Sequence, residues 1–174
     1  MISNRQKGVA FAVLGMVGLL AGRKKTGLGL FGRGFSLLEK EWRREHPEFD
    51  GSLSDRWDLA SKFYEQTHRN ATNRWLHLAG IPMIVVGAAG LIAFKPFRPV
   101  WTAAAGSCAV GWGLNLVGHA VFEKNAPAFA DDPLSFVMGP VWDAKNLFSK
   151  RQASTQKSDL NTDPPLTTHV AASA

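Results

Sequence analysis

Two long apolar stretches decide the fold: LHLAGIPMIVVGAAGLIAF (residues 76–94) and PVWTAAAGSCAVGWGLNLVGHAVF (residues 99–122). Neither contains a charged side chain, and at 19 and 24 residues each is long enough, or nearly so, to cross a bilayer as an α-helix. The KPFRP link (residues 95–99) is short, basic and rich in proline, which breaks helices. The two stretches therefore predict an antiparallel transmembrane hairpin. A buried hairpin in the core of a soluble domain is the alternative.

The charged residues are segregated along the chain. The 174 residues carry 20 Lys and Arg against 14 Asp and Glu, a formal net charge of +6. Basic residues alone precede Glu39, and they account for the whole excess. Because this excess lies in an apolar, glycine-rich segment and not in a basic patch with interleaved aromatics, it favours an anionic membrane surface over nucleic acid as the partner. The single cysteine, Cys108, excludes a disulfide framework and a CxxC zinc site.

The segments around the hairpin predict a small all-α integral membrane protein with additional short or interfacial helices. Residues 1–38 form a basic, glycine-rich apolar leader, which is either a short membrane hairpin or a segment outside the main fold. Residues 39–148 form the membrane domain, with a helix from 54 to 64 and an interfacial or re-entrant helix from 134 to 142. Residues 149–174 are polar and contain prolines, so we expect a disordered tail.

Three of the five histidines are placed near one end of the predicted hairpin. His77 and His119 fall at the same end, opposite the KPFRP link, because the two helices run antiparallel. Nine residues separate His68 from His77, which would put their side chains on opposite sides of one continuous helix. A helix that begins near Asn70, with Asn70 or Thr72 as its N-cap, would free His68 to fold back toward the other two.

Polar residues at helical spacing accompany these histidines. Asn115, His119 and Glu123 are each four residues apart and share one stripe, and Asn73 shares a face with His77. Two imidazoles and one carboxylate are the ligands of a 2-His-1-carboxylate site for non-haem iron, which leaves positions open for substrate and oxygen. Asparagines can orient such imidazoles. We therefore take Glu123 and Asn73 as candidate catalytic residues. Hydrogen-bonded structural histidines are the alternative.

The same residues lie in two motifs that resemble a known family. YEQTHRNATNRWLHLAGIP (residues 64–82) and GHAVFEKNAPA (residues 118–128), in this order and separated by a helical hairpin, are similar to the yeast-type 2-hydroxy fatty acid dioxygenases. The resemblance covers roughly residues 60–148. It implies an integral membrane protein that uses Fe(II) and O2 to remove one carbon from a 2-hydroxy fatty acid. Carried over to this chain, the candidate metal ligands are His68, His77 and His119.

The resemblance leaves several points open. Glu123 lies in the second motif, but its role is inferred from spacing, and Asn115 stands where the family often has Gln. Either Glu123 or a third histidine completes the metal site. We expect the protein to lie in the inner membrane of a bacterium or in the endoplasmic reticulum of a eukaryote, with the site facing the cytoplasm. A non-catalytic membrane protein for structure or interaction and a metal-dependent lipid hydrolase are the alternative functions.

Overall fold

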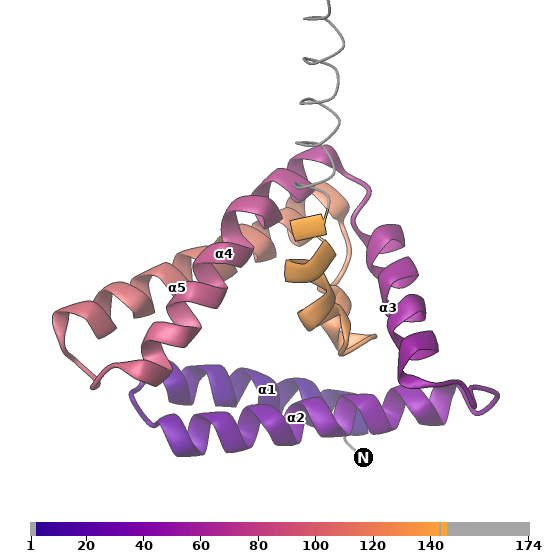
Figure 1. The fold of residues 1–174 in the computed structure, drawn as a ribbon, viewed down its shortest axis with the longest axis horizontal. Coiled ribbons are helices and arrows are strands. Elements are labelled where there is room, and N and C mark those ends of the chain that lie inside the picture. The colour runs from indigo at the N-terminus through magenta and orange to yellow at the C-terminus, as the bar shows by residue number, and fades with distance from the viewer. Residues whose placement is uncertain (1–2, 143, 146–174) are drawn as a thin grey trace, which may run out of the picture. The chain divides into compact units, whose positions relative to one another are not determined.

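The structure, a computed structural model, describes residues 3–142 and 144–145 (Figure 1). The predicted tail, residues 149–174, and the end of the predicted membrane domain lie outside the described residues. Every regular element in the described part is a helix, which confirms the all-α prediction. The elements are α1 (Asn4–Leu20), α2 (Lys24–Glu45), α3 (Leu53–Thr67), α4 (Ala71–Ala93), α5 (Pro99–Val117), the π-helix η1 (Gly118–Glu123) and the 3-10 helix η2 (Ala128–Ala130). Residues 135–142 are also helical.

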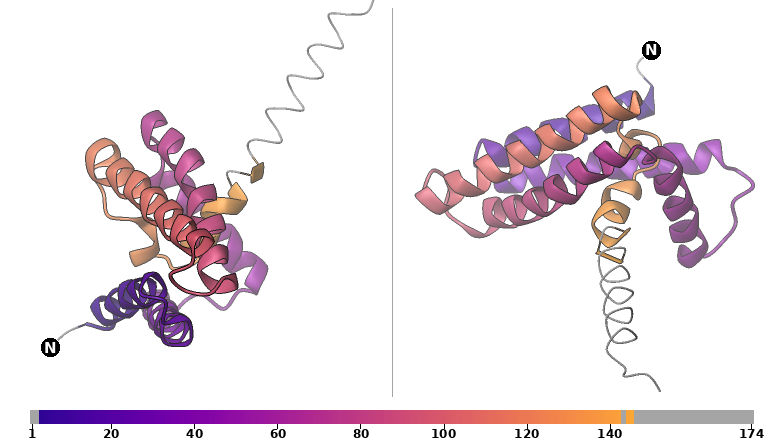
Figure 2. Two further views of the ribbon diagram at one scale, coloured as in Figure 1. Left: turned by 90° about the vertical axis from the view of Figure 1, so that its left-hand side faces the viewer. Right: turned by 90° about the horizontal axis from the view of Figure 1, so that it is seen from above.

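Helices α4 and α5 form the predicted antiparallel hairpin and lie side by side (Figures 1 and 2). Both α4 and the continuous segment Pro99–Glu123 are long and apolar enough to cross a membrane. Within the protein, only 39% and 17% of their apolar windows are buried. A helix in the core of a soluble domain is covered by its neighbours over most of its surface. Most of the apolar surface of this hairpin is left uncovered, as expected for helices that face lipid.

The hairpin helices approach closely where Gly80 of α4 faces Gly111 of α5. A Cβ atom added to Gly111 would lie 2.6 Å from the carbonyl oxygen of Gly80, and one added to Gly80 would lie 2.8 Å from that of Gly111. Backbone atoms cannot turn aside as a side chain can, so only glycine fits at this crossing. Small residues at such contacts are the usual way in which helices pack in lipid.

Replacing Gly111 by alanine is expected to lower the melting temperature of the detergent-solubilised protein. The added methyl group meets backbone and forces the helices apart, at a cost of about 1–3 kcal/mol. Gly113→Ala is the matched control, because nothing lies within 4 Å of a Cβ atom added there and alanine is the better helix former. Equal melting temperatures for the two variants, measured by thermal unfolding, would contradict the close crossing.

Helices α1 and α2 form a second hairpin, and α1 packs against α4. Leu19 joins a buried cluster with Leu91 and Trp101 of the first hairpin. The ammonium group of Lys24 donates to the carbonyl oxygens of Ile92 and Phe94 at 2.7 and 2.6 Å, and thereby caps the C-terminal end of α4. The predicted boundary at residue 38 falls inside α2, because the charged segment that follows it continues the same helix. Whether this hairpin enters the membrane stays a prediction.

Helix α3 connects the two hairpins and carries a buried arginine. Ser52 caps its N-terminus by accepting a hydrogen bond from the backbone N–H of Asp55. The helix extends beyond the predicted range 54–64 at both ends. Arg56 is 1% exposed and donates to both carboxylate oxygens of Asp132, at 2.9 and 2.7 Å. It also donates to Glu39 of α2 at 3.1 Å and lies over the ring of Trp42. These contacts join α2, α3 and the chain after η2.

Arg56→Met is expected to destabilise the protein by about 3–5 kcal/mol, because it leaves the buried carboxylate of Asp132 without its cation. Arg43→Met is the matched control: its side chain is 50% exposed, and its partner Glu39 keeps the contact with Arg56. Thermal or denaturant unfolding of the two variants measures the difference. A similar loss in both would show that the buried network does not hold the helices together.

Candidate metal centre

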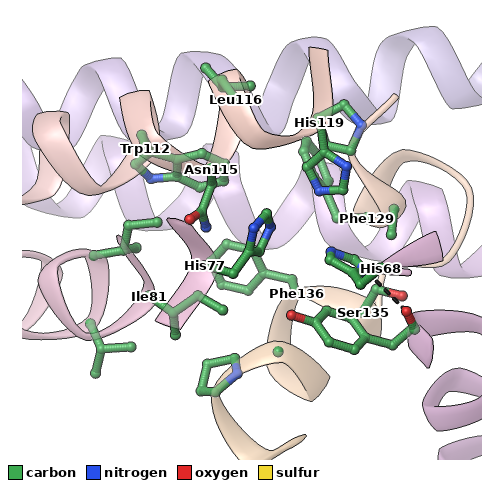
Figure 3. A pocket seen from close by; sticks show the side chains of 17 residues that line it. His68, His77, Ile81, Trp112, Asn115, Leu116, His119, Phe129, Ser135 and Phe136 are labelled. Atoms are coloured by element: carbon green, nitrogen blue, oxygen red, sulfur yellow. Dashed lines mark hydrogen bonds between the residues drawn. The ribbon is translucent and has the colours of Figure 1, made fainter. Parts of the chain in front are cut away.

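Three buried histidines from three different elements converge at the open end of the α4–α5 hairpin (Figure 3). His68 follows the last residue of α3, His77 lies in α4, and His119 lies in η1. Each is 4% exposed. The ring centroids are 4.8, 4.8 and 4.9 Å apart, and one nitrogen of each ring lies within 4.8 Å of the other two. This nearly equilateral group of imidazoles can hold a metal ion.

A break between α3 and α4 places His68. Helix α3 ends at Thr67, and α4 begins at Ala71. The side chain of Asn70 caps α4 by accepting hydrogen bonds from the backbone of Thr72 and Asn73 at 2.9 and 3.2 Å. This confirms the prediction that a helix beginning near Asn70 allows His68 to fold back toward His77.

A π-helix places His119. The wider turn of η1 changes the direction of side chains relative to α5, and such segments are frequent at functional sites. Lys124 ends the segment with a φ of 57°, in the left-handed region. The chain therefore turns back, and the backbone N–H of Asn125 donates to the carbonyl oxygen of His119 at 3.2 Å. The amide nitrogen of Asn125 also donates to the carbonyl oxygen of Thr67 at 3.1 Å, which ties this turn to the end of α3.

Each of the three imidazoles has its Nδ1 atom against an oxygen atom. Because a carbonyl or amide oxygen accepts, Nδ1 carries the hydrogen and Nε2 keeps a free lone pair. In the order His68, His77 and His119, the acceptors are the carbonyl oxygens of Tyr64 and Asn73 and the amide oxygen of Asn125, at 2.9, 3.0 and 2.8 Å. The three rings are thus held with Nε2 available as a ligand.

The environment also keeps His68 uncharged. Burial, followed by the nearby imidazole of His77, lowers the pKa of His68 from 6.5 to about 3. The ring of His68 stacks on that of Tyr64, with centroids 3.9 Å apart. At neutral pH the imidazole is therefore in the form that binds a metal ion.

Glu123 and Asn73 lie beside the three histidines but outside their group. The carboxylate of Glu123 accepts hydrogen bonds from the backbone N–H of Asn70 at 2.7 Å and from the amide of Asn73 at 3.2 Å. Asn73 is completely buried and serves His77 through its backbone oxygen. The group that the structure forms has three histidines where the spacing argument expected two histidines and a carboxylate. A catalytic part for Glu123 and Asn73 stays a prediction.

A pocket with about 620 Å³ of empty space, part of it open to the outside, adjoins the three imidazoles (Figure 3). Its remaining wall is mainly apolar and comes from Tyr64 of α3, from α4 and α5, and from the chain between residues 127 and 140. Val85 and Leu116 line it and are each 49% exposed, so the pocket reaches the outer surface of the two candidate membrane spans. Asn115 also lines it, one turn before His119.

The residues present fit a divalent transition metal. Neutral imidazole nitrogens suit iron, zinc, copper and nickel, and three protein ligands leave positions open for other molecules. Among the residues that complete the site, Asn125 was not predicted from the sequence. Its only signal was its place in the second motif, because a regular helix does not bring a residue six positions on back to His119.

Asn125→Leu is expected to weaken binding of a divalent metal about 10–100-fold, because the ring of His119 loses the oxygen that orients it. His77→Ala should abolish tight binding. His46→Ala is the matched control, since His46 is a histidine of α2's C-terminal end that contacts Trp42 and takes no part in the group. Metal affinity is measured by competition with a chromogenic chelator. Unchanged affinity in His77→Ala would contradict the site.

Comparison with known protein families gives a match. The profile of a family described as 2-hydroxy-palmitic acid dioxygenase Mpo1-like matches residues 56–151, which is more than half of the chain. The matched range includes the three histidines, η1 and the residues that line the pocket, whereas α1 and α2 lie outside it. No curated protein and no solved structure matches the chain.

Proposed function

This chain belongs to the 2-hydroxy-palmitic acid dioxygenase Mpo1-like family, and on that premise we propose that it is a membrane enzyme that removes one carbon from 2-hydroxy fatty acids with Fe(II) and O2. The observation that carries the proposal is the group of three buried imidazoles at the end of an apolar pocket. Three neutral nitrogen ligands leave coordination positions open on a metal, as a metal that also binds a substrate and O2 requires.

Fe(II), when bound, supplies the one-electron chemistry that O2 requires and a positive charge for the acid group of the substrate. The residues that would hold it are His68, His77 and His119, through their Nε2 atoms. The oxygen atoms against Nδ1 fix the three rings before the metal arrives. The buried position of the rings keeps bulk water from the reaction.

The pocket supports a lipid as the substrate. Among residues 3–142 and 144–145, those that line it include aliphatic and aromatic side chains and no lysine, arginine, aspartate or glutamate. Ile81 and Ile84 of α4 and Trp112 of α5 would contact an acyl chain whose acid end lies at the histidines. Because Val85 and Leu116 reach the outer face of the candidate spans, the chain can enter from the bilayer without crossing water.

The distribution of basic residues supports an orientation with the histidines toward the cytoplasm. Arg69, Arg74 and Lys124 lie near the end of the hairpin that carries the site, against Lys95 and Arg98 at the link. Positively charged residues close to membrane spans favour the cytoplasmic side. We therefore propose an integral membrane protein of the bacterial inner membrane or the endoplasmic reticulum, according to its source.

Protein reconstituted with Fe(II) under anaerobic conditions is expected to consume oxygen when air and 2-hydroxypalmitate are added, and to yield the acid that is one carbon shorter. His77→Ala should lose this activity, because the metal loses a ligand, and His46→Ala should retain it. An oxygen electrode and mass spectrometry of the fatty acids give the two readouts.

The alternatives have different outcomes in the same assay. A metal-dependent hydrolase would release fatty acid from a lipid ester and consume no oxygen. A protein with structural histidines would bind no iron, and a His77→Ala/His119→Ala double variant would unfold at a lower temperature with or without metal. Absence of oxygen consumption by the iron-loaded protein across 2-hydroxy acids of several chain lengths would contradict the proposed dioxygenase.

A further inference from the structure

The segment that follows η1 forms one wall of the pocket and rests on the N-terminal hairpin α1–α2. Residues 127–140 contribute this wall, and Figure 1 shows them in the space that α2, α3 and the α4–α5 hairpin surround. The guanidinium group of Arg5 of α1 donates to the carboxylate of Asp131 at 2.8 Å. The buried Arg56 joins the next residue, Asp132, to α2. The position of this wall therefore depends on helices that lie outside the family match.

Phe136 of this wall contacts one ring inside the pocket and one ring outside it. Trp112 of α5, which also lines the pocket, stacks on Phe136 with ring centroids 6.1 Å apart. Phe31 of α2 contacts Phe136 with centroids 5.2 Å apart and an angle of 55° between the ring planes. Of the described residues that line the pocket, none belongs to α1 or α2. Phe31 therefore supports Phe136 from outside the pocket.

This support fixes the ring of Phe136. Side chains in a protein interior are closely packed, and a ring with neighbours on two sides keeps one position. Replacing Phe31 by alanine removes the neighbour behind Phe136. Because surrounding side chains fill part of the space that such a substitution leaves, Phe136 would move away from the pocket and the pocket would widen. Phe31 thus affects the shape of a pocket that it does not line.

We propose that Phe31 is a positioning residue that sets the width of the acyl pocket through Phe136, so that the protein selects unbranched 2-hydroxy fatty acids over methyl-branched ones. This inference rests on the proposed function. An apolar pocket distinguishes acyl chains by shape, since a methyl branch must either fit the wall or displace it. One additional methylene group in such a pocket changes the affinity about 10–200-fold. The N-terminal hairpin thus adds specificity to a metal centre that the matched residues form.

The test measures the binding of 2-hydroxypalmitate and of analogues with one methyl branch, placed at successive carbons from carbon 3 onward. The full-length protein is held in phosphatidylcholine nanodiscs, loaded with Fe(II) and kept free of oxygen, and empty nanodiscs correct for partition into lipid. At the branch positions that meet Phe136, the wild type should bind the branched acid about tenfold or more weakly than the straight one. Phe31→Ala should lose most of this difference.

A double-mutant cycle tests whether Phe31 acts through Phe136. Phe136→Ala should also lose the difference between straight and branched acids, because it removes the wall itself. The double variant Phe31→Ala/Phe136→Ala should then lose no more than Phe136→Ala alone. Phe31→Leu keeps much of the apolar volume and should retain part of the difference. This variant also carries the test where Phe31→Ala does not fold.

Phe35→Ala is the matched control. Phe35 is also a half-buried phenylalanine of α2, one turn after Phe31. In the part of the chain that the structure describes, it forms no ring contact and does not line the pocket. Phe35→Ala should melt at a temperature similar to that of Phe31→Ala, because each removes one half-buried ring, but it should keep the wild-type difference between the acids.

Three results would overturn the inference: equal binding of straight and branched acids by the wild type at every branch position, an unchanged difference in Phe31→Ala, or an equal loss in Phe35→Ala. Oxygen consumption with 2-hydroxypalmitate tests the proposed function separately, since these titrations need no turnover. A wild type that does not bind 2-hydroxypalmitate at all would contradict the proposed function and this inference with it.

Discussion

The structure depends on how the open end of the α4–α5 hairpin is held together. At its other end the two helices are joined by the KPFRP link, but the end that carries the histidines has no covalent connection. Glu123 of η1 links the two helices there by hydrogen bonds: its carboxylate accepts from the backbone N–H of Asn70 and from the amide of Asn73, at the start of α4. A carboxylate at a helix N-terminus is also favoured by the helix dipole. This contact fixes the spacing between His77 and His119.

Irregular backbone on both sides of this contact turns a plain hairpin into a site. Regular helices would present His77 and His119 only, on the two facing surfaces. The break after Thr67 adds His68, and the π-helix with the left-handed turn at Lys124 adds the amide that orients His119. Backbone that leaves helical geometry near a membrane must have its polar groups satisfied. Here the side chain of Asn125 serves both purposes: its nitrogen donates to the carbonyl oxygen of Thr67, and its oxygen orients the ring of His119.

The apolar stretches, the helix-breaking prolines and the N-cap residues were enough to predict three features: the hairpin, the position of His77 and His119 at the same end of it, and a helix that begins near Asn70. The same reasoning placed Glu123 on the stripe of His119 and left open whether Glu123 or a third histidine completes the metal site. The group that the structure forms contains three histidines, and Glu123 accepts hydrogen bonds from Asn70 and Asn73 beside it. Arg56 was missed because a charged residue on an amphipathic helix normally faces solvent. Its partner Asp132 is 76 residues away, and no local pattern reveals such a contact.

The lack of charged side chains among the described residues that line the pocket connects the binding of the proposed metal with that of the proposed substrate. An ionised carboxylate moved from water into an apolar pocket loses much hydration energy, and none of the described residues that line this pocket has a lysine or arginine side chain to compensate. The pKa of His68 is far below neutral, so this imidazole does not supply one either. A divalent ion at the three Nε2 atoms would provide it. On the function proposed above, metal and fatty acid are expected to bind cooperatively, each increasing the affinity for the other by the same factor. On that proposal, the neutral wall makes binding of the substrate's acid group depend on the metal.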